Sequence, residues 1–367
     1  MTSIANLVPP PRRSVGVDTF VRPDWTIIAR DREGGIPLDK NECNDPIFCK
    51  QLSGLLTSLP ADTAIKYPEC APYYSILADD LGLSPRNLLF TAGADGTIRQ
   101  VFEAFLELGE TVLLTTPTFA MMSIYARMYG GKIIELEYVA SDDGPSLEVK
   151  HILEALNHYR PRIFCLSNPD SPTGTIFDLN SLDEIIKTAV KTETVILVDE
   201  AYFPFSKITA LSLIDKYPNL VIARTFAKAW GLAGLRLGYA VANPDMALIL
   251  HKVRPMYEVN GFALAAMTAL IEHKDWMIAS VDSINAGKDY FISRMQEIGL
   301  RTLDSAGNFL HVDFGDNRNN IHAVLEGKVL YKLAFPDPCL FGFSRFSAAP
   351  KETMKIVADI IDGAIKE

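Results

Sequence analysis

The chain has 367 residues, of which 48% are hydrophobic and 22% charged, and its net charge is -10 at neutral pH. This length and composition predict two domains with a sizeable apolar core and exclude an intrinsically disordered protein. The acidic balance argues against nucleic acid and anionic membranes as partners, because both attract clustered Lys and Arg. A small acidic substrate remains compatible, since a few local arginines can bind it.

The five cysteines are scattered and odd in number, and none of them forms a Cys-x-x-Cys motif. We therefore expect reduced thiols in a cytoplasmic protein. The six histidines include no His-x-x-x-His pair beside a Glu, so we expect no metal site. The N-terminus has no apolar run of signal-peptide length, and no segment has the roughly 20 consecutive apolar residues that span a membrane.

From about residue 85 the sequence alternates apolar runs of strand length with segments of helical periodicity. The expected strands are 87–90, 111–115, 132–137, 162–166, 194–198 and 220–224, and the expected helices are 95–108, 118–129, 146–157 and 181–190. This alternation predicts an α/β fold, with a large domain whose mainly parallel sheet is flanked by helices. Ligands of such sheets bind at the carboxyl ends of the strands, so the loops that follow the strands are the candidate sites.

After about residue 244 the pattern changes. Long helices are expected at 260–273 and 275–298, then a strand at 308–314 and a closing helix at 350–365. This pattern predicts a smaller α+β domain completed by N-terminal residues. The expected division is 1–60 for an N-terminal arm and part of the small domain, 61–262 for the large domain, and 263–367 for the C-terminal small domain.

The first two loops in chain order contain a helix start each. In the first, Gly93 lets the backbone approach a ligand, and the amides of Ala94 and Asp95 open a helix, where free N–H groups and the helix dipole bind phosphate. A plain helix start with Asp95 in its first turn is the alternative, and for this loop alone it is favoured. The second loop places Phe119 at a helix start, where a core aromatic is the simpler interpretation.

The next two loops carry polar side chains directly after a strand. The loop from Ser167 to Thr175 has two prolines and a glycine, which fix an unusual turn, and it leaves the amide of Asn168 free to donate to a ligand oxygen. In Leu197-Val-Asp-Glu-Ala-Tyr202, Asp199 follows an apolar strand and is expected to be buried. A buried carboxylate needs a cationic or hydrogen-bonding partner, such as a protonated pyridine nitrogen. The alternative is a helix N-cap.

The fifth loop, from Thr225 to Gly238, contains Lys228 and, eight residues later, Arg236. A lysine in apolar surroundings is a nucleophile toward an aldehyde. A surface lysine is the ordinary alternative, but the apolar neighbours between Phe226 and Trp230 favour burial. Together the five loops supply a phosphate cradle, a stacking aromatic, an oxygen donor, a carboxylate for a pyridinium and an imine-forming lysine. These are the parts that pyridoxal 5'-phosphate (PLP) requires.

These residues resemble a known family, the fold type I PLP enzymes, and within it the class I/II aminotransferases of the histidinol-phosphate aminotransferase group. The resemblance covers nearly the whole chain and is carried by Val21-Arg-Pro-Asp24, Leu38-Asp-Lys-Asn-Glu42, Lys66-Tyr-Pro68, Val198-Asp-Glu-Ala-Tyr202 and the stretch from Lys228 to Gly238. It implies transfer of an amino group between an amino acid or amino-alcohol phosphate, of the histidinol-phosphate type, and a 2-oxo acid such as 2-oxoglutarate. It also implies a homodimer.

The resemblance implies a role for each residue around the cofactor ring. Lys228 forms the imine with PLP and, once the donor amine has displaced it, removes the substrate Cα proton and returns it to the cofactor. Asp199 pairs with the pyridine nitrogen, and Phe119 stacks on the ring. Tyr202 and Asn168 hydrogen-bond the ring hydroxyl oxygen.

The resemblance also implies how the cofactor phosphate is held. The amides of the Gly93-Ala94-Asp95 segment bind it together with Arg236, and Tyr67 reaches it from the other subunit. The family usually has Ser directly before the lysine. Here that residue is Ala227, so one phosphate hydroxyl is missing, and Thr225 is expected to compensate in part. Gly96 stands where the family often has an acidic residue.

The resemblance also implies that Arg345 binds the substrate carboxylate and that Asn41 is a second residue of the substrate site. Around Arg345 the family pattern is displaced by one residue relative to Pro350, and the stretch 318–339 is short. A decarboxylase of the threonine-phosphate type also resembles this pattern and uses the same lysine and aspartate, and it is the closest alternative. A PLP-binding regulator is disfavoured by the absence of a further N-terminal module. A nucleotide-binding protein is disfavoured because no glycine-rich phosphate motif follows a predicted strand.

Overall fold

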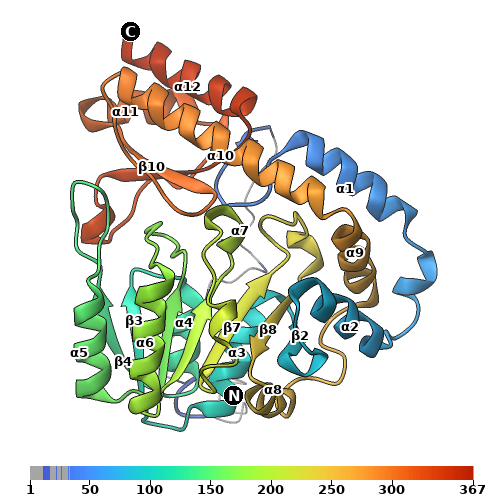
Figure 1. Ribbon diagram of the computed structural model, residues 1–367. Helices are drawn as coiled ribbons and strands as arrows, with labels where there is room; N and C mark the ends of the chain where they lie inside the picture. The colour runs from blue at the N-terminus through green and yellow to red at the C-terminus, as the bar shows by residue number, and fades with distance from the viewer. Residues whose placement is uncertain (1–10, 17–21, 23–25, 27–31, 33, 367) are drawn as a thin grey trace, which may run out of the picture.

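The computed structural model describes residues 11–16, 22, 26, 32 and 34–366. Its centre is a seven-stranded sheet with the strand order β2-β8-β7-β6-β5-β3-β4 (Figure 1). The strands are β2 (Leu88–Thr91), β3 (Thr111–Thr116), β4 (Lys132–Glu137), β5 (Ile163–Ser167), β6 (Val195–Asp199), β7 (Leu220–Thr225) and β8 (Gly238–Ala242). Only β8 runs antiparallel to its neighbours. The expected α/β class with a mainly parallel sheet is thus confirmed.

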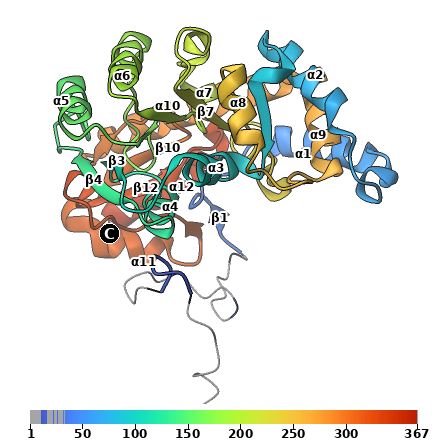
Figure 2. The same ribbon diagram turned by 90° about the horizontal axis from the view of Figure 1, so that it is seen from below.

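Both faces of this sheet are buried, and side chains alternate between them along each strand. In β5, Phe164 and Leu166 pack on one face, whereas Ile163 and Cys165 pack on the other. The first face is covered by α2 (Cys70–Leu81), α5 (Val149–Tyr159), α6 (Leu179–Lys191) and α9 (Gly261–Glu272). The second is covered by α3 (Gly93–Phe105), α4 (Ala120–Met128) and α8 (Pro244–His251), and Figure 2 shows α5 and α6 opposite α3 and α4.

The C-terminal part contains a three-stranded antiparallel sheet of order β12-β10-β9. Its strands are β9 (Arg301–Leu303), β10 (Phe309–Asp313) and β12 (Phe343–Ser347), and its helices are α10 (Lys274–Glu297), α11 (Arg318–Leu325) and α12 (Lys351–Lys366). N-terminal residues join this part, because β1 (Ile36–Pro37) pairs in parallel with β11 (Val329–Leu330). Of the family marker Val21 to Asp24 only Arg22 lies among the described residues, and the first ten residues of the chain also lie outside them.

Several elements were not predicted from the sequence. They are α1 (Pro46–Ser58), α2, the four-residue α7 (Phe203–Ser206), α8, α11 and the strands β1, β8, β9, β11 and β12. The expected elements are present, most of them with shifted ends; helix α3, for example, begins at Gly93 and ends at Phe105 instead of spanning 95–108. Within the described residues no helix is both long and apolar enough to cross a bilayer.

Candidate active site

A pocket of about 410 Å³ lies at the carboxyl ends of three neighbouring parallel strands. Ser167 ends β5, Asp199 ends β6 and Thr225 ends β7, and all three line the pocket. The expected site residues on its wall are Ala94, Asp95, Phe119, Asp199, Tyr202, Thr225, Lys228 and Arg236. Residues from five separate loops therefore meet at one sheet edge, as the topology of a parallel sheet requires.

Lys228 points into this pocket. Its Nζ donates a hydrogen bond to the carbonyl oxygen of Lys40 at 2.9 Å and lies 5.5 Å from the centroid of the Tyr202 ring. The loop that carries it is anchored by Phe226, which is buried and whose N–H donates to the carbonyl oxygen of Leu237, the residue before β8. The amine of this half-buried lysine is thus presented to the same space that Asp199 lines.

Asp199 is buried, and burial raises the pKa of its carboxyl group to about 7, although a hydrogen bond from the Ala201 N–H at 3.0 Å opposes this shift. The nearby carboxyl of Asp170 raises the pKa further. The helix N-cap alternative is wrong, because α7 begins at Phe203 and its N-cap is Tyr202. A buried carboxylate of this kind is stabilised by a cation, and the protonated nitrogen of a pyridine ring is one that fits.

Asp170 is a second buried carboxyl group, which the sequence analysis did not single out. Thr118 Oγ1 donates to its Oδ2 at 2.6 Å, and the Thr173 N–H and Oγ1 donate to its Oδ1 at 3.1 and 2.7 Å. Burial raises the pKa of Asp170 to about 6. Because Thr118 precedes Phe119, this carboxyl connects the segment of Phe119 to the loop after β5. Its position within that proline-rich loop was the only sequence signal.

The start of α3 has the features of an anion cradle. Its N-cap residue, Ala92, makes no side-chain capping hydrogen bond, and Asp95 lies in the first turn of the helix. A Cβ atom on Gly93 would lie 2.9 Å from Nη2 of Arg236, and one on Gly238 would lie 2.7 Å from the Ala94 nitrogen. The two glycines therefore let a guanidinium and a strand approach the first turn of the helix, where amides bind phosphate.

The residue before the lysine, Ala227, lines the pocket without a hydroxyl group. The hydroxyl of Thr225 lies two residues earlier, where it accepts a hydrogen bond from the Ala227 N–H at 3.1 Å and donates to Leu237 O at 3.4 Å. Thr225 Oγ1 thus fixes the backbone that leads to Lys228. Compensation for the missing serine by Thr225 stays a prediction.

Asn41 and Tyr202 connect the pocket to the C-terminal sheet. Asn41 Nδ2 donates to the Tyr202 hydroxyl at 3.1 Å, and Ser347 Oγ donates to Asn41 Oδ1 at 3.0 Å. Burial alone would raise the pKa of Tyr202, but the charges of Lys228 and Arg345 and the hydrogen bond from Asn41 outweigh it and lower that pKa. The surroundings of the Tyr202 hydroxyl are therefore positively charged. Such surroundings would also stabilise a negatively charged ring oxygen of a ligand.

Arg345, on β12, lies at the edge of the pocket where the two parts of the protein meet. Its Nη2 donates to Asp39 O at 3.0 Å, its Nη1 donates to Ser171 Oγ at 3.5 Å, and its guanidinium carbon lies 5.3 Å from the Phe309 ring centroid. Ser171 itself lines the pocket, although it was not among the site residues expected from the sequence. The Nε atom of this guanidinium is buried and makes no hydrogen bond.

Two expected residues are placed differently from the rest. Asn168 is fully buried; its Nδ2 donates to Phe177 O at 3.1 Å, and its Oδ1 accepts from the Phe177 N–H at 2.7 Å. The expectation of a wholly free amide was therefore wrong, and a ligand can receive only the second N–H of that amide. Tyr67 lies outside the pocket, is exposed, and stacks on Tyr257 with 4.3 Å between ring centroids.

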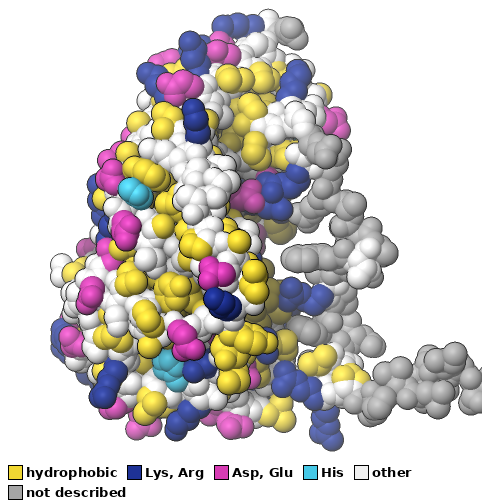
Figure 3. All heavy atoms as spheres, turned by 90° about the vertical axis from the view of Figure 1, so that its right-hand side faces the viewer, with side chains coloured by type: hydrophobic (Ala, Val, Ile, Leu, Met, Phe, Trp, Pro, Cys, Tyr) yellow, Lys and Arg dark blue, Asp and Glu magenta, His cyan; other side chains and the backbone are white. Residues whose placement is uncertain are grey.

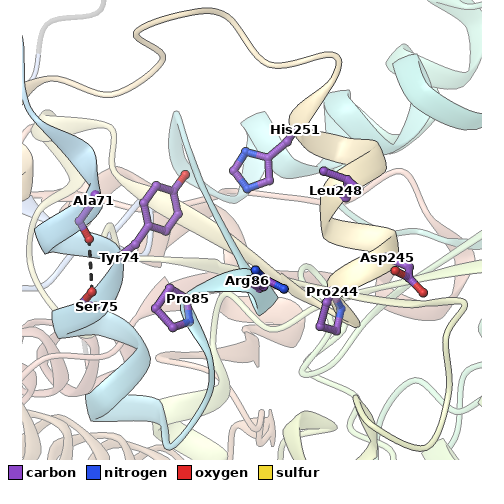
Figure 4. A pocket seen from close by; sticks show the side chains of 9 residues that line it. All are labelled: Ala71, Tyr74, Ser75, Pro85, Arg86, Pro244, Asp245, Leu248 and His251. Carbon is purple, nitrogen blue, oxygen red and sulfur yellow. Dashed lines mark hydrogen bonds between the residues drawn. The ribbon is translucent and has the colours of Figure 1, made fainter.

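A second, more open pocket of about 610 Å³ lies between α2 and α8 (Figure 4). Its two ring side chains with polar atoms are engaged with the backbone of β2. His251 Nε2 lies 3.0 Å from Leu88 O, and the Phe90 N–H donates to the Tyr74 hydroxyl at 3.1 Å. Both rings therefore make backbone contacts rather than facing an empty space alone. Within the described residues no group of three or more His, Cys, Asp or Glu could hold a metal ion.

The comparisons with known proteins agree with this geometry. Residues 69–361 match the family described as Aminotransferase class I and II. Histidinol-phosphate aminotransferase 1 of Carboxydothermus hydrogenoformans is 34% identical over 249 residues, which cover 68% of this chain and 69% of that protein. The histidinol-phosphate aminotransferase of Syntrophotalea carbinolica is 28% identical over 338 residues, 91% of this chain and 94% of that protein.

Among solved structures, the histidinol-phosphate aminotransferase from Sinorhizobium meliloti in complex with pyridoxal-5'-phosphate superposes with a TM-score of 0.76. It is 26% identical, and the match covers 90% of each chain. The chain therefore belongs to the class I and II aminotransferase family, and it is a PLP-dependent enzyme that transfers amino groups. Within that family it is similar to the histidinol-phosphate aminotransferases.

Proposed function

We propose that this enzyme transfers the amino group of histidinol phosphate, or of a closely similar amino-alcohol phosphate, to a 2-oxo acid such as 2-oxoglutarate. The observation that carries the proposal is the pocket itself, in which Lys228, Asp199 and the start of α3 converge. The names of the similar proteins support the choice of substrate. The amino donor carries a phosphate, whereas the 2-oxo acid carries a carboxylate. The guanidinium of Arg345 can bind either anion through two hydrogen bonds.

We assign the residues to the following tasks. When bound, PLP supplies an aldehyde that condenses with amines and a ring that accepts the electron pair of the substrate Cα–H bond. The Nζ of Lys228 takes the proton from the substrate Cα atom and later returns a proton on the same face, acting as base and then as acid. The carboxylate of Asp199 holds a proton on the ring nitrogen, and Tyr202 with Asn168 donates to the ring oxygen.

The amino donor is tested by a half-reaction screen with the holoenzyme and no acceptor. Histidinol phosphate and glutamate are each expected to convert the visible absorbance of the lysine-bound cofactor to that of the aminated cofactor. Failure of histidinol phosphate while an aromatic amino acid reacts would contradict the proposed donor. Release of carbon dioxide from threonine phosphate would favour a decarboxylase. In the Arg345→Lys variant both expected donors should need higher concentrations, because a lysine cannot form the two-pronged contact.

We also propose that the enzyme is a homodimer in which Tyr67 reaches the partner's cofactor phosphate. The exposed apolar side chains Ile65, Tyr67, Met256 and Tyr257 belong to segments that border one pocket of about 590 Å³, and exposed patches of this kind mark interfaces. Figure 3 shows hydrophobic side chains gathered on the side of the molecule that carries α1, α2 and α9. The patch contacts the helix whose first turn lines the pocket, because Glu258 accepts a hydrogen bond from Gln100 of α3.

Light scattering of the purified holoenzyme tests this assembly. The expected mass is twice the 40.5 kDa of one chain. The Tyr67→Ala variant should remain a dimer and bind PLP more weakly, by about tenfold for a lost hydrogen bond to a charged group. A fully active monomer would contradict the proposal.

We propose a cytoplasmic location as well, which the five free thiols favour and which cell fractionation tests.

A further inference from the structure

Two cysteines lie on either side of the start of helix α1. Asp45 caps this helix, since its Oδ1 accepts from the Ile47 N–H at 2.9 Å, and the Cys49 N–H donates to Asp45 O at 2.9 Å. This turn folds the first residues of α1 back over the preceding segment. As a result Cys49 Sγ lies 3.7 Å from the carbonyl oxygen of Cys43, and the two thiols are hydrogen-bonded to each other.

The two thiols differ in exposure. Cys49 is exposed to solvent, whereas Cys43 is half-buried against α10, where its Sγ lies 3.8 Å from Ser280 Oγ. An oxidant can therefore reach Cys49 first, and Cys43 is the nearest second thiol. A cysteine pair of this kind, one exposed and one resolving, is the arrangement found at reversible thiol–disulfide sites.

The segment before Cys43 forms part of the active site. The carbonyl oxygen of Lys40 accepts the hydrogen bond from Lys228 Nζ, the side chain of Asn41 donates to the Tyr202 hydroxyl, and Glu42 lines the pocket. Asn41 adopts a left-handed backbone conformation, with φ 54°, and its N–H donates to Ser347 Oγ at 2.8 Å. A movement of Cys43 would therefore displace the three residues before it, and with them the contacts of the catalytic lysine.

We propose that Cys43 and Cys49 are a redox-modification site, and that a reversible disulfide between them lowers the activity of the enzyme. The oxidant is a low-molecular-weight disulfide, R–S–S–R. The Cys49 thiolate attacks one of its sulfurs, which forms a Cys49–S–S–R bond and releases the first R–SH. Cys43 then attacks Cys49 Sγ, which forms the Cys43–Cys49 bond and releases the second R–SH. Two protein thiols are oxidised, and one small disulfide is reduced to two thiols.

The acid–base properties of the pair favour this order of attack. The hydrogen bond from Cys43 lowers the pKa of the Cys49 thiol and outweighs the opposing effect of burial. The same hydrogen bond, together with burial, raises the pKa of Cys43. The exposed sulfur is therefore the one that holds the nucleophilic thiolate, since the thiolate and not the thiol attacks a disulfide.

The predicted loss of activity follows from the geometry of the bond. A disulfide brings its sulfurs to about 2 Å from each other, closer by roughly an ångström or more than hydrogen-bonded thiols. Cys49 is held in a helix, so the segment at Cys43 has to move. Misplacement of catalytic contacts by about 1 Å can cost on the order of 100-fold in rate. We therefore expect the half-reaction to slow by about tenfold or more in the oxidised form.

The test uses the holoenzyme in mixtures of 2-mercaptoethanol and bis(2-hydroxyethyl) disulfide, which carry no amine that could react with the cofactor. Alkylation of the remaining thiols and peptide mass spectrometry should find an intramolecular link between Cys43 and Cys49. The rate of the glutamate half-reaction should fall as the link forms and recover fully after reduction. The link is read independently of activity, so a failure of the proposed donor would leave this test intact.

The Cys49→Ser and Cys49→Ala variants should keep the activity of the reduced enzyme and lose its sensitivity to the oxidant. Cys70→Ser, which alters a half-buried thiol outside the pair, should respond as the unmodified enzyme does. The proposal is overturned if the oxidant modifies other thiols without forming the link between Cys43 and Cys49. It is equally overturned if the link forms with no change in rate, or if the oxidant still lowers the activity of both Cys49 variants.

Discussion

Replacement of Lys228 by alanine is expected to remove the visible absorbance of the lysine-bound cofactor and to abolish transamination. Lys228 lines the pocket together with Asp199, and its amine lies over the Tyr202 ring. Loss of proton transfer alone costs about 100- to 10,000-fold in rate, and loss of the covalent bond adds to this. Absorbance spectra and the rate of the half-reaction measure the two effects separately.

Lys40 provides a matched control, because it lines the same pocket but takes part through its backbone carbonyl. The Lys40→Ala variant should keep the cofactor absorbance and react with amino donors. If the Lys228 variant kept both the absorbance and turnover while the Lys40 variant lost them, the assignment of the cofactor lysine would be wrong. The comparison also controls for a general loss of positive charge in the pocket.

Replacement of Asp199 by alanine or asparagine is expected to leave the cofactor bound through Lys228 but to slow the half-reaction strongly. Removal of one partner of a buried charge pair costs about 3–5 kcal/mol, which corresponds to roughly 100- to 1,000-fold or more in rate. Asp170→Asn is the control, because it replaces the other buried carboxyl while keeping hydrogen-bonding groups in place. A variant at Asp199 with an unchanged rate would contradict the proposed pairing with the ring nitrogen.

The cofactor-free protein gives an independent test of Asp199 through pH. Burial raises its pKa from the usual 3.8 to about 7. Between these values the unfolded chain has lost a proton that the folded protein keeps, so the free energy of unfolding falls as pH rises through this window. The loss reaches up to about 4 kcal/mol above pH 7, at ~1.4 kcal/mol for each unit of pKa. Asp199→Asn should therefore stabilise the cofactor-free protein at pH 8 and have little effect near pH 4.

Thermal unfolding of the cofactor-free forms at several pH values measures this difference. When PLP is added, the Asp199→Asn variant should instead be less stable than the original protein. The ring cation stabilises the carboxylate of Asp199, and an asparagine cannot replace that carboxylate. A variant that is less stable than the original protein at pH 8 without cofactor would contradict the account of Asp199 as an uncompensated buried charge.

The parts of the site that the sequence could predict are those that depend on local order along the chain. Carboxyl ends of parallel strands share one edge, so Asp199 and Lys228, which follow two predicted strands, had to lie close together. The strand 132–137 was predicted with its observed ends because a β-branched, apolar run is bounded there by glycines and a turn. The general class of cofactor followed from residue types in those loops.

The parts that could not be predicted depend on contacts between distant segments. Asn41 and Tyr202 are 161 positions apart, and Arg345 and Asp39 are 306 apart. No periodicity in the sequence encodes such pairs. Strand β8 was missed because it begins at Gly238, at the end of a glycine-rich stretch that reads as a loop. Asn168 was misjudged because its partner, the backbone of Phe177, lies beyond the turn that the prolines impose.

Treatment of the holoenzyme with sodium borohydride, followed by peptide mass spectrometry, tests the central assignment most directly. Borohydride reduces the bond between the cofactor and its lysine and so fixes the cofactor mass on one residue. We predict that this mass is found on Lys228. Its presence on Lys40 or on any other lysine, or its absence from every peptide, would contradict the account given of this active site.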